Sequence, residues 1–371
     1  MNMRSKLIPI FVMISLSALI LGRVTAQAPS TDVPSGELVF LRQIDSNWHV
    51  VRANTDGSDL QELYAPDLDH GEGPSAPLWS PNGQKILFSV NYYPQPSKPE
   101  TVRQYLYLID ADGSNLIKVG DFERSSTTFV LNHYVYGGWS PDSQAFIYGY
   151  YQTESDGSTR TEFFKVDLKG KSLSLNPKPA PSYKSVLYMP DGKLIILDQE
   201  GILTIENGER SVPKVIKADA EINFLYDISA DGKYALCLLN KSFTFGVLNI
   251  DTGRFRSLRE ISDGMVVYEA RWSPEGNHFL VQGTPKSDVG VAWVTAVVET
   301  ESGQITTLEE GPGFLYGRVD WSADGAYLIF ENNKEGGSAL YLSRPDGSEK
   351  TKLMAGAHAH WRPEPKGKAA P

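Results

Sequence analysis

Short apolar runs alternate with tight turns along almost the whole chain. Runs at residues 86–88, 106–109, 146–148, 194–197 and 279–281 are too short for helices and rich in β-branched and aromatic residues, which favour strands. Many turns end in glycine, as at Asp112-Gly113, Thr252-Gly253 and Ser302-Gly303, where a hairpin needs positive φ. The pattern therefore predicts antiparallel strands throughout, in groups of four.

Each group contains a short motif at the end of its first strand and in the turn to the second. Its copies are W-S-P-N-G at 79–83, W-S-P-D at 139–142, Y-M-P-D-G at 188–192, I-S-A-D-G at 228–232, W-S-P-E-G at 272–276, W-S-A-D-G at 321–325 and W-R-P at 361–363. We call the first residue of each copy its anchor. The anchors are 40 to 60 residues apart. A repeat of about 40 to 50 residues indicates a solenoid or a propeller.

The two ends of the chain carry complementary parts of one group. Residues 38–41, 49–51 and 61–63 are predicted to form the last three strands of a group that lacks an anchor, whereas Trp361 is an anchor without those strands. Joining the two fragments gives seven complete sheets and removes exposed sheet edges. The fold class expected is therefore all-β: a seven-bladed β-propeller of four-stranded antiparallel blades, closed by N- and C-terminal strands that share one blade.

The repeats resemble the TolB-type, WD-like β-propeller repeat, whose hallmark is W-S-P-D-G between the first two strands of a blade. The resemblance covers residues 36–363 and rests on the motif copies given above. TolB proteins usually have six blades and an added N-terminal domain, which this chain lacks. The resemblance therefore concerns the repeat, and it implies an inner strand that ends at each anchor, beside a central channel.

The first 26 residues differ from the rest. Arg4 and Lys6 precede an uncharged apolar stretch at 7–21, and small residues follow at 24–26, as in a secretory signal peptide. An uncleaved membrane anchor is the alternative, although the stretch is shorter than the roughly 20 residues that span a bilayer. The expected organisation is a signal peptide at 1–26, a linker at 27–35, the propeller at 36–363 and a disordered tail at 364–371. We expect an extracytoplasmic protein: periplasmic, cell-envelope or secreted.

Charge and cysteine content narrow the possible partners. The formal net charge is −10, and removal of Arg4, Lys6 and Arg23 with residues 1–26 makes it −13. Such a surface disfavours nucleic acid and anionic lipid. Cys237 is the only cysteine and lies in an apolar run, so we expect a buried thiol and no internal disulfide. We expect a monomer without stable membrane insertion after cleavage.

The sequence lacks the motifs of several enzyme classes. No G-x-S-x-G, Gly-rich phosphate loop or C-x-x-C occurs, and the repeats leave no room for an α/β-hydrolase domain. Residues 110–115 have some features of a calcium loop, but a hairpin turn explains them better.

Two histidines, His358 and His360, precede the anchor Trp361. Residues at i and i+2 on a strand share a face, so both side chains are expected at the channel mouth, where such a pair can hold a metal. The arrangement is similar to that in oligogalacturonate lyases, seven-bladed relatives in which an H-x-H pair before an anchor helps to bind manganese. No clear third ligand is found, although His70 and His133 also lie shortly before anchors. The alternative is a pair of ordinary rim histidines.

Charged residues also gather one or three positions before consecutive anchors. They are Asp227, Glu269, Arg271, Arg318 and Asp320. The set predicts either a polar ligand or partner site at the mouth or a network of mutual ion pairs. The favoured function is an exported non-enzymatic binding or scaffold propeller for a protein, peptide or glycan, with no cofactor. The alternative is a metal-assisted polysaccharide lyase or hydrolase that uses His358 and His360.

Overall fold

The computed structural model describes residues 33–67, 73–92, 102–124, 128–131, 138–153, 159–176, 183–206, 214–239, 243–287, 292–312, 318–332 and 337–364. The chain divides into a unit Met1–Val33 and a unit Pro34–Pro371, and the second contains all the strands that the structure describes. The expected signal peptide, most of the linker and nearly all of the expected tail lie outside the described residues. Among the described residues, no helix is long and apolar enough to cross a membrane.

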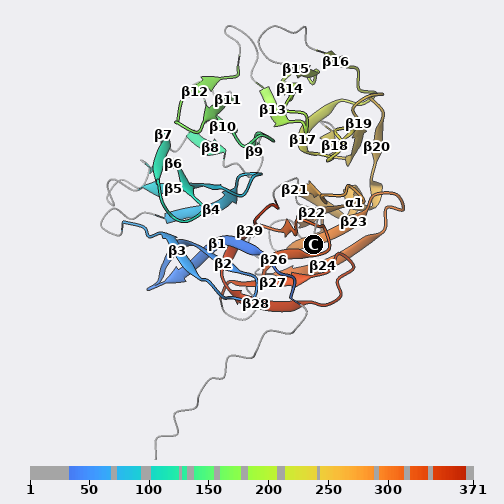
Figure 1. The fold of residues 1–371 in the computed structure, drawn as a ribbon. Helices are drawn as coiled ribbons and strands as arrows, with labels where there is room; N and C mark the ends of the chain where they lie inside the picture. Colours follow the sequence, from blue (N-terminus) through green and yellow to red (C-terminus); the bar gives the residue numbers. More distant parts are fainter. Residues whose placement is uncertain are drawn as a thin grey trace, which may run out of the picture. The chain divides into compact units, whose positions relative to one another are not determined.

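Seven antiparallel sheets are arranged as blades around a central axis, which confirms the predicted seven-bladed propeller (Figure 1). We number the blades from the one that joins both chain ends. From the axis outward, blade 1 contains β29 (Ala357–Trp361), β1 (Glu37–Ile44), β2 (Asn47–Asn54) and β3 (Gln61–Tyr64). Blade 2 contains β4 (Gly73–Trp79), β5 (Lys85–Tyr92), β6 (Val102–Asp110) and β7 (Ile117–Arg124).

Blade 3 departs from the regular pattern at its inner strand. Two short pieces, β8 (Thr128–Leu131) and β9 (Gly138–Trp139), both pair with β10 (Ala145–Thr153), which is followed by β11 (Thr159–Asp167) and β12 (Ser172–Ser174). Blade 4 is regular, with β13 (Tyr183–Tyr188), β14 (Leu194–Asp198), β15 (Leu203–Glu206) and β16 (Lys214–Ile216).

Blades 5 to 7 complete the ring. Blade 5 contains β17 (Ile222–Ile228), β18 (Tyr234–Leu239), β19 (Phe245–Asn249) and β20 (Phe255–Ser257), followed by the short helix α1 (Arg259–Gly264), which the sequence pattern did not predict. Blade 6 contains β21 (Met265–Trp272), β22 (His278–Pro285), β23 (Ala292–Glu299) and β24 (Ile305–Pro312). Blade 7 contains β25 (Asp320–Trp321), β26 (Leu328–Asn332), β27 (Ala339–Ser343) and β28 (Thr351–Ala355).

The chain ends close the ring within blade 1. Leu38 of β1 pairs with Trp361 of β29, and Val39 pairs with His360. Arg362 forms an ion pair with Glu37, and its Nε donates to the carbonyl oxygen of Gly83 in blade 2, 2.9 Å away. The shared blade therefore ties the last strand both to the first strand and to the neighbouring blade.

In blades 2, 3, 5 and 7 a serine of the motif holds the turn between the first two strands. The Ser80 hydroxyl donates to Asn82 Oδ1 at 2.8 Å and accepts the N–H of Lys85 at 2.9 Å. The corresponding serines at 140, 229 and 322 make the same two bonds. The last turn position has positive φ, as at Gly83 (65°), and Ser143 adopts it at 62° where glycine is missing.

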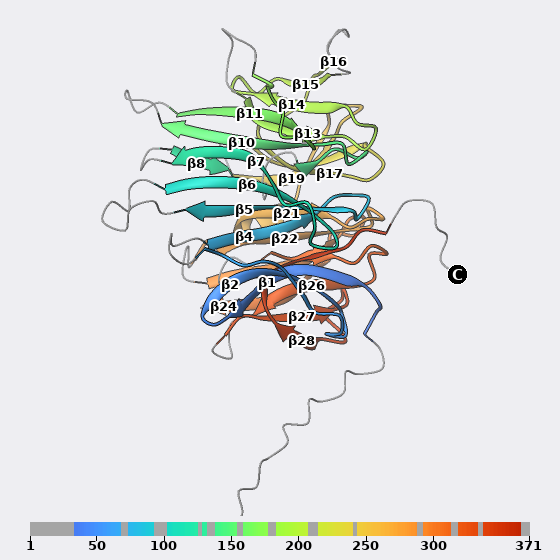
Figure 2. The same cartoon turned by 60° about the vertical axis from the view of Figure 1, so that its left-hand side comes forward.

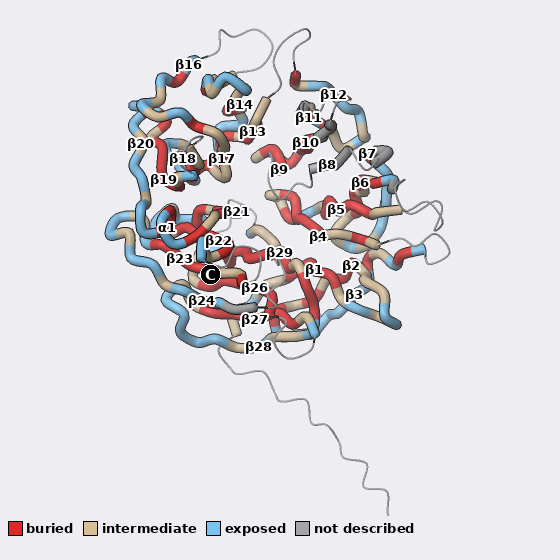
Figure 3. Tube along the Cα trace, turned by 180° about the vertical axis from the view of Figure 1, so that it is seen from behind, coloured by how far each residue is buried: buried red, intermediate tan, exposed pale blue. Residues whose placement is uncertain are grey.

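The core consists of apolar layers between successive blades. Trp79 packs with Val39 and Val50 of blade 1 as well as with Phe88 of its own blade. Trp139, Trp272 and Trp321 likewise contact both their own and the preceding blade. Figure 3 shows the buried positions on the inner and middle strands, with exposed positions mainly on the outer ones. Seen from the side, the strands of successive blades stack on one another (Figure 2).

Candidate binding site at the mouth of the central channel

A cavity of about 630 Å³ lies at the end of the channel where the inner strands terminate. Every blade contributes the residue that immediately precedes its anchor, as the repeat alignment predicts. These residues are Leu78, Gly138, Leu187, Asp227, Arg271, Asp320 and His360. The rim is formed by motif turns, including Pro81, Pro274 and Ala323.

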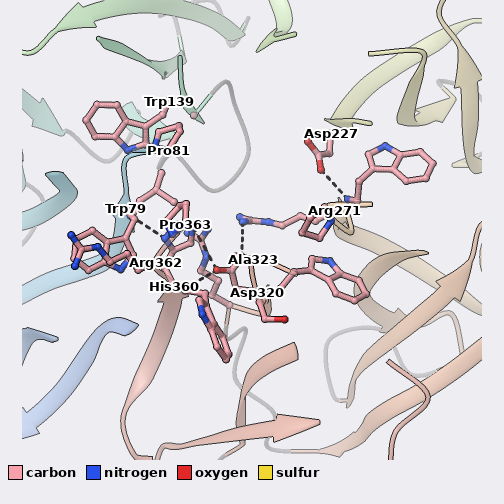
Figure 4. Close-up of a pocket in the computed structure, with 18 of the residues that line it drawn as sticks. Trp79, Pro81, Trp139, Asp227, Arg271, Asp320, Ala323, His360, Arg362 and Pro363 are labelled. Carbon is pink, nitrogen blue, oxygen red and sulfur yellow. Dashed lines mark hydrogen bonds and ion pairs between the residues drawn. The ribbon is translucent and has the colours of Figure 1, made fainter. Parts of the chain in front are cut away.

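The charged candidates occupy one sector of this cavity. Arg271 Nε donates to Glu269 Oε1 at 2.6 Å, and its Nη1 lies 3.9 Å from Asp320 Oδ1 (Figure 4). Glu269 and Arg318 also line the cavity, although they are only 3% and 1% exposed. The structure therefore brings together four of the predicted charged residues from blades 6 and 7, with Asp227 beside them in blade 5.

The environment shifts the pKa values of these groups. Burial raises the pKa of Asp227 to about 6, although the N–H of Trp272 and the charge of Arg271 oppose the change. Burial also raises the pKa of Asp320 against the opposing charges of Arg318 and Arg271. Burial alone would lower the pKa of Arg271, but Glu269, Asp320 and Asp227 together raise it. Arg271 is therefore a permanent cation in the cavity.

Three residues that precede anchors bind the backbone of the next blade. Trp272 N donates to Asp227 Oδ2 at 2.9 Å, Trp361 N donates to Asp320 Oδ2 at 2.8 Å, and Trp79 N donates to His360 Nδ1 at 3.0 Å. Asp227 Oδ1 also accepts the N–H of Ile228 at 2.8 Å. These side chains therefore link neighbouring blades as well as line the cavity.

The two histidines occupy different environments. His360 lines the cavity, and its Nδ1 accepts the backbone N–H of Trp79. The proton of the neutral imidazole is therefore on Nε2. Nε2 lies 3.6 Å from Asp320 Oδ2. His358 lies at a bulge between β29 and β1, has a φ of 52° and is absent from the cavity lining. Burial, and then the charge of Arg318, lower the pKa of His358 to about 4. The bulge disrupts the simple i, i+2 geometry that two metal ligands on one strand would need.

No group of three or more His, Cys, Asp or Glu side chains that could hold a metal occurs among the described residues. His70 and His133, the other histidines near anchors, lie outside that part of the chain. Cys237 is fully buried in blade 5, and burial raises the pKa of its thiol.

Some cavity residues carry no sequence signal that the repeat alignment could use. Tyr226 and Tyr268 lie at irregularities in the register of β17 and β21, and such bulges re-aim side chains. Arg362 follows the last anchor, lies over the Trp79 ring at 4.9 Å and lines the rim. A bulge depends on the pairing of two strands, so the inner strand alone does not reveal it.

The chain is similar in sequence to an uncharacterized protein, Atu1656, of Agrobacterium fabrum. The two are 27% identical over 220 residues, which is 57% of this chain and 72% of that protein. No protein-family model matches the chain.

Several solved structures share the fold at low sequence identity. Periplasmic gluconolactonase of Pseudomonas aeruginosa superimposes with a TM-score of 0.55 and 16% identity, over 90% of this chain and all of that one. TolB of Acinetobacter baumannii superimposes with a TM-score of 0.54 and 15% identity, over 90% of this chain and 69% of that one. A prolyl endopeptidase superimposes with a TM-score of 0.55 and 13% identity, over 89% and 49%. At such identities the likeness establishes a β-propeller fold alone.

Proposed function

We propose that the protein is an exported, non-enzymatic propeller that binds a segment of a protein, peptide or glycan at the channel mouth. The observation that carries this proposal is the cavity of about 630 Å³, to which all seven blades contribute residues. Its volume falls within the range of small-ligand sites, and it combines apolar walls with a few convergent charged groups. A cavity of this size accepts a chain segment or a small ligand and is too small for a folded domain.

The bonding of the polar groups favours binding over catalysis. Asp227 and Asp320 accept backbone hydrogen bonds from the next blade, and His360 Nδ1 does the same. A general base needs an acceptor directed at the substrate, and a nucleophile needs such a base beside it. Here the acidic side chains and the histidine are directed at fixed backbone and guanidinium donors.

Export is supported by the basic and apolar character of residues 1–26. A structural neighbour described as periplasmic, the gluconolactonase of Pseudomonas aeruginosa, agrees with it. The net charge of −13 after removal of those residues supports a partner other than nucleic acid or an anionic membrane. A monomer is proposed because the closed ring pairs both ends of the chain.

The proposal is tested by blocking the mouth. Ligands are first selected on the wild-type protein from a phage-displayed peptide library and a glycan array. Ala323 is exposed on the rim, so Ala323→Trp should fill the entrance and weaken binding at least tenfold without a change in melting temperature. The control is Ala230→Trp, which alters the equivalent exposed turn position of blade 5, away from the cavity lining. Unchanged affinity in the Ala323 variant, or no ligand from either collection, would contradict the proposal.

A further inference from the structure

Arg271 extends a charged side chain into the mouth. It arises from β21, one residue before the anchor Trp272, and Figure 4 shows its guanidinium near the middle of the cavity. Its side chain is 21% exposed, so the group is held by the protein and still accessible from the channel.

Glu269 fixes the orientation of this guanidinium. Its carboxylate is almost fully buried and accepts the Nε–H of Arg271 at 2.6 Å from the same face of β21. Asp320 Oδ1 lies 3.9 Å from Nη1, which is beyond hydrogen-bond distance. Within the part of the chain that the structure describes, the terminal Nη edge of Arg271 therefore remains available for a ligand, in a geometry that suits a bidentate carboxylate.

Backbone donors reduce the negative charge around Arg271. Arg271 and Arg318 face three carboxylates of the cavity lining, those of Asp227, Glu269 and Asp320. The carboxylates of Asp320 and Asp227 are directed at the backbone N–H groups of Trp361 and Trp272, respectively. Their negative charge is thus partly neutralised by fixed backbone donors.

The walls favour an apolar side chain over a sugar ring. Leu78, Leu187, Pro274 and Ala323 line the cavity together with the anchors. Sugar recognition usually needs exposed aromatic faces, but Trp79, Trp139, Trp272 and Trp321 are each less than a tenth exposed because they pack between blades. Tyr268 also lines the cavity and is 41% exposed, but its ring packs against Trp293 at a centroid distance of 5.3 Å. Part of its aromatic surface is therefore covered within blade 6.

We infer that the mouth is a receptor for the free carboxyl terminus of a peptide or protein chain. Arg271 binds the terminal carboxylate through its Nη edge, and the last side chains of the ligand pack against the apolar wall. Glu269 is a positioning residue that holds the guanidinium in place. This inference rests on the proposed binding function and narrows it to one ligand chemistry.

Two pools of random heptapeptides test the inference, one with free carboxyl termini and one with amidated termini. Each pool is incubated with the purified protein, and the retained peptides are identified by mass spectrometry. Retention is expected from the free-acid pool alone, and amidation of a retained peptide should weaken its binding at least tenfold. Equal retention from both pools would overturn the carboxylate inference and leave the binding function standing. Retention of neither pool, or binding of oligogalacturonate instead, would overturn the peptide assignment.

Variants then locate the site. Arg271→Gln should weaken binding of a selected free-acid peptide at least tenfold. Arg271→Lys should retain part of the binding affinity, because an ammonium group keeps the positive charge but lacks the paired N–H donors of a guanidinium. The control is Arg256→Gln, an exposed residue of blade 5 whose Nη2 donates to Thr300 O. Because Arg271→Gln leaves Glu269 buried beside a neutral group, the double variant Glu269→Gln/Arg271→Gln is measured as well, with melting curves for all variants. A folded double variant that binds as tightly as the wild type would overturn the inference.

Discussion

Asp320 joins the seventh blade to the first through the backbone of Trp361. Its Oδ2 accepts the N–H of Trp361 at 2.8 Å, across the junction at which the chain closes on itself. The same link recurs between Asp227 and Trp272 and between His360 and Trp79. A side chain placed just before one anchor therefore binds the anchor of the following blade.

These links explain why buried acids accumulate around the channel. A buried carboxylate is costly unless it is paired and hydrogen-bonded. Here the cost is offset by backbone donors and by Arg271 and Arg318, which leaves the guanidinium of Arg271 as the group best placed for a ligand.

Replacement of Asp320 should weaken the closure of the ring. Asp320→Ala leaves the buried N–H of Trp361 without its acceptor and removes a counter-charge from Arg271 and Arg318. The free energy of unfolding is expected to fall by about 2 to 4 kcal/mol, measured by urea denaturation. Asp346→Ala is the control, since Asp346 is exposed and bonds only within its own turn, and it should cost less than about 1 kcal/mol. Equal losses in the two variants would contradict the link.

Truncation tests the shared blade as a whole. Deletion of residues 356–371 removes β29, so β1 loses its inner partner and Trp361 its packing. We expect a loss of about 5 kcal/mol or more, or failure to fold, from unpaired backbone and lost burial. Deletion of residues 365–371 alone, beyond the last described residue, should leave the melting temperature unchanged. The same melting temperature for both truncations would refute the closure.

Two buried groups should give opposing pH dependences. Asp227 has a folded pKa of about 6, above its unfolded value of 3.8, so its contribution to stability is full below pH 3.8 and is lost as the pH rises through 6. His358 has a folded pKa of about 4, below its unfolded value of 6.5, so its contribution is present above pH 6.5 and is lost as the pH falls through 4. Each shift of about 2 units corresponds to about 3 kcal/mol, so the two effects largely cancel between pH 4 and 6.

Single substitutions should separate these two effects. Asp227→Asn removes the carboxyl group whose protonation stabilises the folded state at low pH. This variant should therefore lose stability relative to wild type as the pH falls from 6 to 4. His358→Gln removes the imidazole whose protonation destabilises the folded state at low pH. This variant should therefore gain stability relative to wild type over the same range. Urea midpoints at pH 4, 5, 6 and 7 give both slopes. Parallel curves for wild type and both variants would show that neither group titrates as described.

The sequence was sufficient to predict the number of blades and, in each blade, one residue that lines the mouth, the residue before the anchor. The turn after the anchor is closed by the same backbone hydrogen bond in blades 2 to 7, so the residue before each anchor reaches an equivalent place in the ring. Leu78, Arg271 and His360 therefore all line one cavity although they are far apart in the chain. Local turn chemistry repeated at a regular spacing carried this information.

The roles of Asp227, Asp320 and His360 could not be read from the sequence. Their partners are backbone N–H groups, which every residue except proline possesses, so the partner carries no signature. The bulge at His358 and the divided inner strand of blade 3 depend on how two strands pair. Such features emerge only when the whole ring is assembled.

The anchor tryptophans should contribute through packing rather than through hydrogen bonds. The Nε1 atoms of Trp79, Trp139, Trp272 and Trp321 are buried and have no hydrogen-bond partner among the described residues. Trp272 contacts Phe279 at a centroid distance of 5.4 Å and lies in the layer that also contains Phe245 of blade 5. Trp272→Ala should therefore cost about 3 to 5 kcal/mol, as a large core truncation does.

Trp272→Phe separates packing from hydrogen bonding in the same position. It keeps an aromatic ring and removes the N–H, so it should cost about 1 to 2 kcal/mol, well below the alanine variant. Chemical denaturation of both variants supplies the comparison. A phenylalanine variant as unstable as the alanine one would show that a single six-membered ring cannot fill the layer, and an alanine variant of wild-type stability would remove the anchor from the core.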